Sequence, residues 1–351
     1  MHSTRRLREN RQKLIIIEVL LILTVLLISG LIWHGNNIKK NCQEADHLVV
    51  YTPHPIEFVK PLIEEFERRS GISVEVITGG TGQLEEQLEN GQQIDVMWGG
   101  SYFSVSPYSD LFADYLSENE KYYLSVNQNK EGNMTRFTDV PSVLMVNTDL
   151  MGDIKIEGYD DLLQPELKGK IAFADPAKSS SSFEQLINML YACGGGIPDK
   201  GWDYIHQLCS NLDGQLLDSS SEVYNGVAEG KYLVGLTFEE AAVTLLREGQ
   251  HVKIIYMKEG VISTPDGIYL LKGAVHAEEA KEFIDFLTGY DAQYMITQRL
   301  GRRSVRIDLL QPNGLPAKKD IHILYANAKQ VLESRDDWIA EFDRIFEEES
   351  R

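Results

Sequence analysis

A run of four consecutive serines stands directly before a segment with helical periodicity, residues 183–193; these serines are Ser179, Ser180, Ser181 and Ser182. The first turn of a helix leaves backbone N–H groups without intrahelical partners, and neighbouring hydroxyl groups complete a site suited to phosphate. A simpler interpretation is a capping box formed by Ser181 and Glu184, which needs no ligand. The serines therefore predict either an anion site or a local cap.

A glycine-rich turn at residues 79–82 precedes a second expected helix, residues 83–89. Thr81 and Gly82 lie at its start, where glycine lets a ligand approach the backbone closely. Two helix starts that face each other across a cleft would clamp one phosphate or phosphonate between them. The alternative is that Thr81 or Gly82 only caps its own helix.

Two adjacent acids, Glu239 and Glu240, follow an expected strand at residues 234–237 and open a helix at residues 241–247. Carboxylates accept hydrogen bonds from sugar hydroxyls and pair with amines. Neighbouring side chains on a helix diverge by about 100°, so these two acids do not form an acid–base pair for catalysis. Their alternative role is a solvated first turn, which the helix dipole favours.

Three further candidates follow expected strands. Thr52 ends the strand at residues 48–52, His54 stands between two prolines, and Ser101 follows the strand at residues 95–98. Ligands of open α/β sheets gather at the carboxyl ends of strands. We expect these three side chains at the rim of a cleft, although His54 is equally consistent with a lone surface histidine. Catalytic and metal-ligating residues are not expected.

Strands and helices alternate along most of the chain, which is the pattern of an α/β fold. Besides the segments above, strands are expected at residues 72–77, 143–147, 171–174, 252–256 and 267–271. Further helices are expected at residues 61–69, 201–209 and 277–288, and the acidic C-terminal stretch from residue 321 to 351 is expected to be helical. Arg302, Arg303 and Arg306 would form salt bridges with acidic helices or reach a ligand.

The N-terminal segment predicts export. Residues 1–13 carry five basic side chains against one acid, and residues 14–33 are almost entirely apolar. A run of that length matches a membrane-spanning helix, and a basic flank keeps the N-terminus inside the cell. We expect a cytoplasmic tail at residues 1–13, a transmembrane anchor or signal segment at residues 14–33, and a stalk at residues 34–46. The bulk of the chain would lie on the outer face of a bacterial membrane.

Charge and cysteine usage narrow the functional classes. The 351 residues carry a net charge of −19, which argues against binding nucleic acid. Cys193 and Cys209 are compatible with a disulfide outside the cell and also with two free thiols, whereas Cys42 lies in the stalk. The spacing of the three cysteines fits no metal motif.

Four stretches in order resemble the extracellular solute-binding proteins of ATP-binding-cassette importers: VVYTPHPIEFVKPLIEEFERRSGISVEVITGGTGQL, DVMWGGSYFSV, YDDLLQPELKGKIAFADPAKSSSS and TPDGIYLLKGAVHAEEAKEFIDFLTGYDAQ. The likeness is to the branch that holds ferric-iron, aminoalkylphosphonate and hexose-phosphate receptors. It implies a two-lobe α/β fold of the periplasmic-binding-protein-like type II, with two crossovers and a C-terminal helical segment. The implied lobes are residues 47–142 with 266–351, and residues 143–265.

The resemblance also bears on the ligand. Iron receptors of this branch carry an adjacent tyrosine pair where this chain has Glu239 and Glu240, so ferric iron is the alternative rather than the leading ligand. The serine run stands where the resembled receptors hold an anion. We therefore expect a small anionic ligand, such as a sugar phosphate, a phosphoglycerate or a phosphonate, and no cofactor.

Three functions compete on these observations. The first is a monomeric, membrane-tethered receptor that delivers its ligand to an importer permease. The second keeps the receptor but presents the ligand to a membrane sensor kinase. The third is an enzyme, which the sequence disfavours because it lacks a Gly-x-Ser-x-Gly elbow, a His-Glu-x-x-His pair and a phosphate-binding Gly-Lys-Ser/Thr loop.

Overall fold

The computed structural model of the chain describes residues 47–130 and 132–350. The expected tail, membrane segment and stalk, with Cys42, therefore lie outside the described residues. Within the described part, no helix is long and apolar enough to cross a membrane. The described residues from Leu48 onward form one compact unit.

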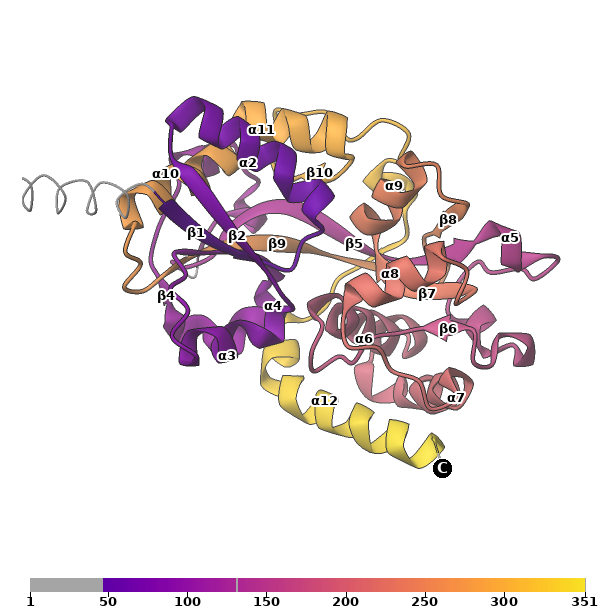
Figure 1. The fold of residues 1–351 in the computed structure, drawn as a ribbon. Helices are drawn as coiled ribbons and strands as arrows, with labels where there is room; N and C mark the ends of the chain where they lie inside the picture. Colours follow the sequence, from indigo (N-terminus) through magenta and orange to yellow (C-terminus); the bar gives the residue numbers. More distant parts are fainter. Residues whose placement is uncertain (1–46, 131, 351) are drawn as a thin grey trace, which may run out of the picture. The chain divides into compact units, whose positions relative to one another are not determined.

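Eleven strands of the described chain join one sheet (Figure 1), with the central order β2-β1-β3-β9-β5-β7-β6. The strands are β1 His47–Thr52, β2 Ser73–Thr78, β3 Val96–Ser101, β4 Phe112–Ala113, β5 Thr135–Asn147, β6 Ile171–Ala172, β7 Val234–Phe238, β8 Val252–Ile255, β9 Val261–Leu271, β10 Arg303–Ser304 and β11 Ile323–Leu324. Pairing is parallel between β1 and β3 and between β6 and β7. It is antiparallel where β9 meets β3 and β5, and where β5 meets β7. The sheet is therefore mixed, with its antiparallel pairs at the centre.

Helices cover the sheet and the connections between its strands. They are α2 Ile56–Ser70, α3 Leu84–Glu89, α4 Tyr102–Val105, α5 Thr148–Met151, α6 Ser180–Cys193, α7 Trp202–Leu212, α8 Ser220–Ala228, α9 Glu239–Arg247, α10 Ala277–Thr288, α11 Tyr290–Met295 and α12 Ala328–Glu349. A 3₁₀ turn, Thr81–Gln83, leads into α3. Helix α8 has no counterpart among the elements expected from the sequence.

Two long strands connect the two ends of the sheet (Figure 1). The first half of β5 pairs with β9, and from Ser142 onward β5 pairs with β7 on one edge and, from Leu144, with β8 on the other. Strand β9 in turn pairs with β3 at its other end. Thus β1, β2 and β3 form one group of strands, β6, β7 and β8 form another, and β5 with β9 runs through both.

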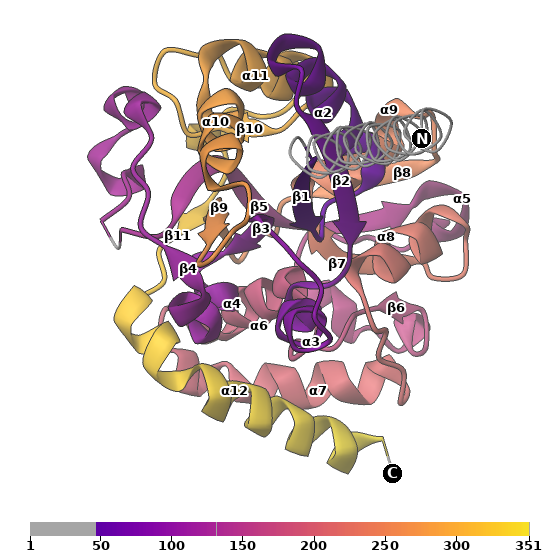
Figure 2. The same ribbon diagram turned by 60° about the vertical axis from the view of Figure 1, so that its left-hand side comes forward.

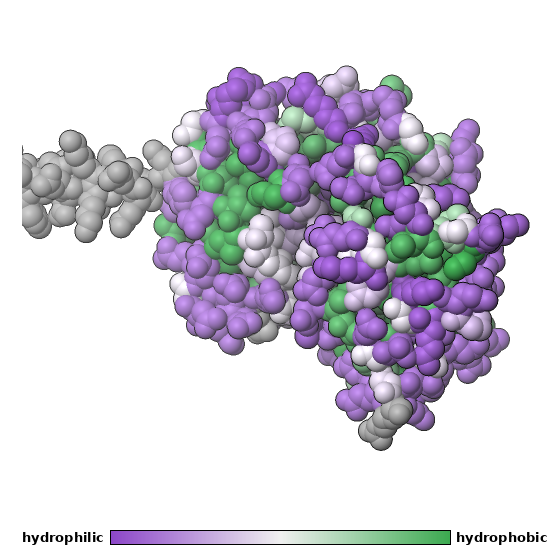
Figure 3. Space-filling view, turned by 45° about the vertical axis from the view of Figure 1, so that its right-hand side comes forward, coloured by the Kyte–Doolittle hydropathy of each residue, from purple (hydrophilic) through white to green (hydrophobic). Residues whose placement is uncertain are grey.

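The apolar cores follow these two groups. Phe58, Phe66 and Phe283 belong to a core under α2 and α10 beside β1 and β3. A larger core beside β6 and β7 gathers the apolar faces of α6 and α7. Burial of these side chains is the main stabilising contribution. On the face that Figure 3 shows, charged and polar side chains dominate, with apolar patches between them.

The C-terminal helix differs from its expected place. Residues 266–351 were expected with the first lobe, but the buried side chains of α12 belong to the core of α6 and α7. Trp338 packs edge-on against Tyr191, and Phe342 packs edge-on against Phe173. Figure 2 shows α12 running along α7, with its first turns near α4. The physical reason is the apolar stripe of α12, which finds its partners on α6 and α7.

The two cysteines of the described part are free thiols. Cys209 is buried and Cys193 is partly buried. Burial raises the pKa of each thiol to about 12. Both groups are therefore protonated and unreactive at neutral pH.

Candidate functional site

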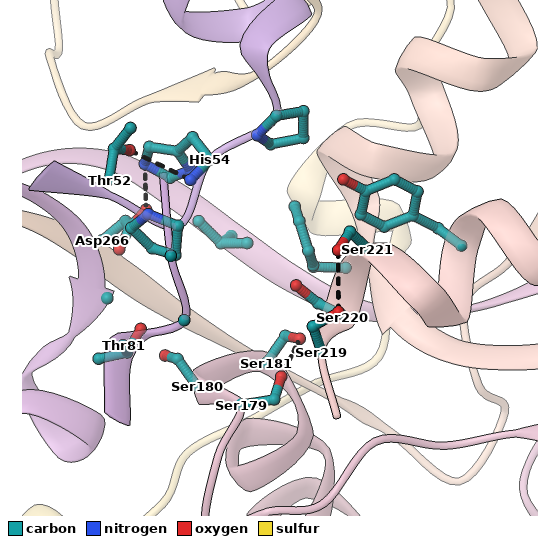
Figure 4. A pocket seen from close by; sticks show the side chains of 18 of the residues that line it. Thr52, His54, Thr81, Ser179, Ser180, Ser181, Ser219, Ser220, Ser221 and Asp266 are labelled. Atoms are coloured by element: carbon teal, nitrogen blue, oxygen red, sulfur yellow. Dashed lines mark hydrogen bonds and ion pairs between the residues drawn. The ribbon is translucent and has the colours of Figure 1, made fainter. Parts of the chain in front are cut away.

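A cleft of about 570 Å³ lies between the two groups of strands. From the first group it is lined by the turn after β1, the turn before α3 and the end of β3. From the second group it is lined by the first turns of α6 and α8, and residues of β5 and β9 lie between. Figure 4 shows the hydroxyl groups of both groups gathered around this space. The cleft is large enough for a small organic ligand.

Three of the four serines lie at this cleft. Ser179 is the N-cap residue of α6, and Ser180 and Ser181 form its first turn. Ser182 is fully buried beneath them and does not line the cleft. The hydroxyl oxygens of Ser179 and Ser181 lie 3.2 Å apart. The backbone N–H groups of Ser180 and Ser181, at the start of α6, therefore stand beside the half-buried hydroxyls of these two residues and the buried N-cap hydroxyl of Ser179.

Thr81 lies opposite the serines on the first group of strands (Figure 4). Its side chain is 3 % exposed, and its hydroxyl has no hydrogen-bond partner among the described residues. Gly82 lines a smaller cavity behind the cleft instead of the cleft itself. The two groups also touch here, because the hydroxyl oxygens of Ser104 and Ser180 lie 2.6 Å apart.

The capping-box interpretation does not describe Glu184. Its carboxylate accepts hydrogen bonds from Ser101 at the end of β3 and from Thr264 in β9, the latter at 2.7 Å. Burial raises the pKa of Glu184 to about 7, with a smaller contribution from Asp266, although the two hydroxyl donors act the other way. Ser101 thus lies at the cleft as expected, and Glu184 is a cleft residue that the sequence suggested only as a cap.

His54 also lies at the cleft, with a charged side chain close to each of its ring nitrogens. Nδ1 lies 3.2 Å from Arg302 and Nε2 lies 3.1 Å from Asp266. Burial, and to a smaller extent the Arg302 charge, lowers the pKa of His54, so the neutral ring accepts a hydrogen bond from Arg302 at Nδ1. Its Nε2 lies close to Asp266 but makes no hydrogen bond with a described residue. Burial disfavours ionisation of Asp266, yet His54 and Arg302 together hold the pKa of its carboxyl below the usual value.

Thr52 has a structural part in the same turn. Its hydroxyl donates to the carbonyl oxygen of Trp98 at 2.6 Å and accepts from the backbone N–H of His54 at 3.1 Å. The side chain is fully buried, although the residue borders the cleft. Thr52 therefore fixes the turn that carries His54.

Glu239 and Glu240 do not line the cleft, contrary to expectation. Glu239 forms a buried ion pair with Arg303 at 2.9 Å and accepts a 2.5 Å hydrogen bond from Tyr256. Glu240 accepts from Thr244 at 3.1 Å, and burial raises the pKa of its carboxyl. Both acids point away from the cleft because two buried arginines, Arg302 and Arg303, attract them. Glu240 lies 3.9 Å from Arg302.

Sequence reasoning missed the first turn of α8. Ser219 is its N-cap residue and accepts from the backbone N–H of Glu222 at 3.3 Å, while Ser220 and Ser221 line the cleft (Figure 4). The available signal was a second serine run followed by glutamate, which repeats the pattern before α6. An exposed ion pair of 2.6 Å between Lys178 and Asp218 links the two serine turns.

The charges that line the cleft are mostly acidic. Carboxyl groups come from Glu57, Glu184, Asp218, Glu222 and Asp266. The only strongly basic side chains in the lining are Lys178 and Arg302, and each is paired with a carboxylate. Within the described residues no group of three or more His, Cys, Asp or Glu side chains is arranged to hold a metal ion. Negative charge on a ligand would therefore rest on backbone N–H and hydroxyl donors.

Comparison with known proteins now identifies relatives of this arrangement. Residues 48–299 match the family model described as bacterial extracellular solute-binding protein. A probable ABC transporter periplasmic-binding protein of Sinorhizobium fredii is 24% identical over 306 residues, covering 84% of this chain and 82% of that protein. Both the matched family and this relative are solute-binding proteins rather than enzymes.

Solved structures agree on the architecture. The periplasmic binding protein AfuA from Actinobacillus pleuropneumoniae, with exogenous fructose-6-phosphate bound, superimposes with a TM-score of 0.77 at 21% identity, covering 86% of this chain and 98% of that one. A two-component system protein that mediates signal transduction superimposes with a TM-score of 0.67 at 29% identity, covering 81% and 95%. The fold is accordingly the two-lobe α/β fold of periplasmic binding proteins.

Proposed function

We propose a ligand class for the cleft on the premise that this chain belongs to the bacterial extracellular solute-binding proteins. It is a non-enzymatic receptor of an ABC transporter. The proposal is that the cleft captures a small phosphorylated organic anion, such as a sugar phosphate, a phosphoglycerate or a phosphonate. The receptor would hold this ligand on the outer face of the cytoplasmic membrane and deliver it to a permease.

The observation that carries the proposal is the pairing of Thr81 with the first turn of α6. Thr81 supplies a buried hydroxyl without a partner among the described residues, and Ser180 and Ser181 supply hydroxyls beside free backbone N–H groups. These are hydrogen-bond donors on two sides of one space, which suits a tetrahedral group with several acceptor oxygens. The 14-residue length of α6 adds the partial positive charge of its dipole.

The rest of the lining favours a neutral or cationic remainder of the ligand. Carboxylates of Glu57, Asp218 and Glu222 line the cleft, and among them Asp218 has a basic partner, Lys178. Carboxylates accept hydrogen bonds from sugar hydroxyls and pair with an amine, whereas they repel a second carboxylate. Among the three ligand types, a sugar phosphate or an aminoalkylphosphonate fits this lining better than a phosphoglycerate.

The proposal also covers the membrane anchor, the division of the chain into lobes and the partner protein. We propose that residues 14–33 anchor a monomeric receptor in the membrane, and that residues 143–265 form the second lobe while residues 47–142 and 266–327 form the first. A second candidate output is presentation of the ligand to a membrane sensor kinase. It is favoured by the 29% identity to a two-component system protein.

Titration calorimetry of the full chain in detergent tests the ligand class. The probes are fructose 6-phosphate, 2-aminoethylphosphonate, 3-phosphoglycerate, inorganic phosphate, unphosphorylated fructose and ferric citrate. We expect micromolar or tighter binding of one organic phosphate or phosphonate, and none of fructose. A double variant, Ser180→Ala with Ser181→Ala, should weaken that binding at least about tenfold, since each lost hydrogen bond to a charged group is worth about 1.5–3 kcal/mol.

The control is Ser109→Ala, which removes an exposed hydroxyl outside the cleft. Unchanged affinity in the double variant would refute the anion subsite. Binding of ferric citrate alone would replace the proposed ligand class with a hard cation.

A further inference from the structure

A second, much smaller cavity of about 10 Å³ lies behind the serine turn of α6. It shares four lining residues with the cleft: Thr81, Lys178, Ser179 and Ser180. The serine turn and Thr81 therefore stand between the two spaces, with the cleft on one side and the small cavity on the other. The volume is that of a single water molecule.

Arg335 of α12 closes this small cavity from behind. Its guanidinium group lies 5.3 Å from the centre of the Phe183 ring, in the first turn of α6. One guanidinium nitrogen, Nη1, pairs at 2.9 Å with Asp336, whose side chain is 90% exposed. Such an exposed pair contributes little to stability, and Arg335 has no other ion pair with a described residue.

Besides the Thr81 hydroxyl, the small cavity has a second buried donor, the Nε of Arg335. The atom is buried and has no hydrogen-bond partner in the part of the chain that the structure describes. The hydroxyls of Ser104 and Ser180, 2.6 Å apart, belong to the same lining. A water in this cavity would have several polar partners, which is the condition for a stable buried water.

A buried donor without a partner costs free energy unless something compensates it. An anion at the serine turn would compensate both Thr81 on the cleft side and the charge of Arg335 on the far side. The two residues come from opposite ends of the chain, and each faces the same first turn of α6. An anion bound at this turn would explain why both side chains face it.

We propose that Arg335 is a positioning residue of the anion subsite, acting on the bound phosphate or phosphonate through the first turn of α6 and a water in the small cavity. The inference rests on the proposed function and deepens it. It also gives α12 a role in recognition, although α12 lies beyond residues 48–299, which the family model matches.

Calorimetry with three variants of the full chain tests this inference. The probes are inorganic phosphate and the organic phosphate or phosphonate that the wild type binds. Arg335→Gln removes the charge, Arg335→Lys keeps it, and the control Arg344→Gln removes a charge from the exposed face of the same helix. Far-ultraviolet circular dichroism and melting temperature report whether each variant is folded.

We expect Arg335→Gln to raise the Kd about tenfold, which is the size of one charge interaction near a protein surface. Arg335→Lys should recover most of the affinity, and Arg344→Gln should leave the Kd unchanged. The slope of log Kd against log salt concentration should become shallower in Arg335→Gln only, because a purely structural role would not change it.

Equal Kd values for Arg335→Gln and the wild type would overturn the role of Arg335 and leave the proposed function standing, provided that the serine double variant still loses binding. Loss of folding in Arg335→Lys, which keeps both the charge and an aliphatic stem, would mean that Arg335 acts on stability instead. Failure of every phosphorylated probe to bind the wild type would overturn the proposed function and this inference together.

Discussion

The free energy of unfolding of the wild type should fall as the pH rises towards neutrality, because Glu184 then ionises in a buried place. Replacing Glu184 by glutamine should abolish this fall. Burial raises the pKa of this carboxyl from 4.5 to about 7 in the folded chain. Between these values the folded chain holds a proton that the unfolded chain has released. The stability that this proton supplies is fully present below pH 4.5 and is lost as the pH rises through about 7.

The magnitude follows from the two pKa values. A difference from 4.5 to about 7 corresponds to about 3 kcal/mol of unfolding free energy, at about 1.4 kcal/mol for each pH unit. About 2.5 kcal/mol of this falls between pH 5 and pH 8, where the titration curve can be followed. Glutamine keeps an acceptor for the hydroxyls of Ser101 and Thr264 but carries no charge.

Urea unfolding at intervals from pH 5 to pH 8 measures the effect. The difference in unfolding free energy between Glu184→Gln and the wild type should shift by about 2.5 kcal/mol in favour of the variant across this range. Ser181→Ala, an uncharged change in the same turn of α6, should track the wild type in parallel. A difference that stays constant with pH would contradict this prediction, because it would mean that Glu184 ionises in the folded chain as readily as in water.

Two further predictions concern stability. Arg303→Met leaves the buried Glu239 without its partner and should lower the unfolding free energy by about 3–5 kcal/mol, whereas the double change with Glu239→Leu should recover much of the loss; a loss below about 1 kcal/mol in urea unfolding would mean that the pair is well solvated. Gly99→Ala should lower the melting temperature, since Gly99 has φ +128° and an added Cβ would lie 2.8 Å from a Pro53 ring carbon. A strained residue of this kind costs about 1–3 kcal/mol, and an unchanged melting temperature would contradict it.

The part of the cleft that the sequence predicted depends on local signals. Ser179, Ser180 and Ser181 precede a strongly periodic helix, and a helix start beside a strand end lies at the cleft edge of an α/β sheet whatever the rest of the chain does. Thr81 and Ser101 reach the cleft for the same reason. Short-range pattern and strand order suffice for such positions.

The missed part depends on residues far apart in the chain. Glu239 begins its helix as expected, but its direction is decided by Arg303, 64 residues later. Ser219 and Ser221 were overlooked because α8 contains Gly226 and has only nine residues, so its periodicity is weak. Arg335 reaches the serine turn only because α12 packs on α6 and α7. The spacing of residues along the sequence does not reveal such long-range contacts.

The position of α12 has a mechanical consequence for the two lobes. It contacts α4 of the first lobe and α7 of the second, so it bridges them on one side of the molecule. At another part of the cleft, Glu57 of α2 and Tyr224 of α8 line the space from the first and the second lobe. A change in the distance between the lobes would therefore have to move α12 against α4 or α7, in addition to bending β5 and β9.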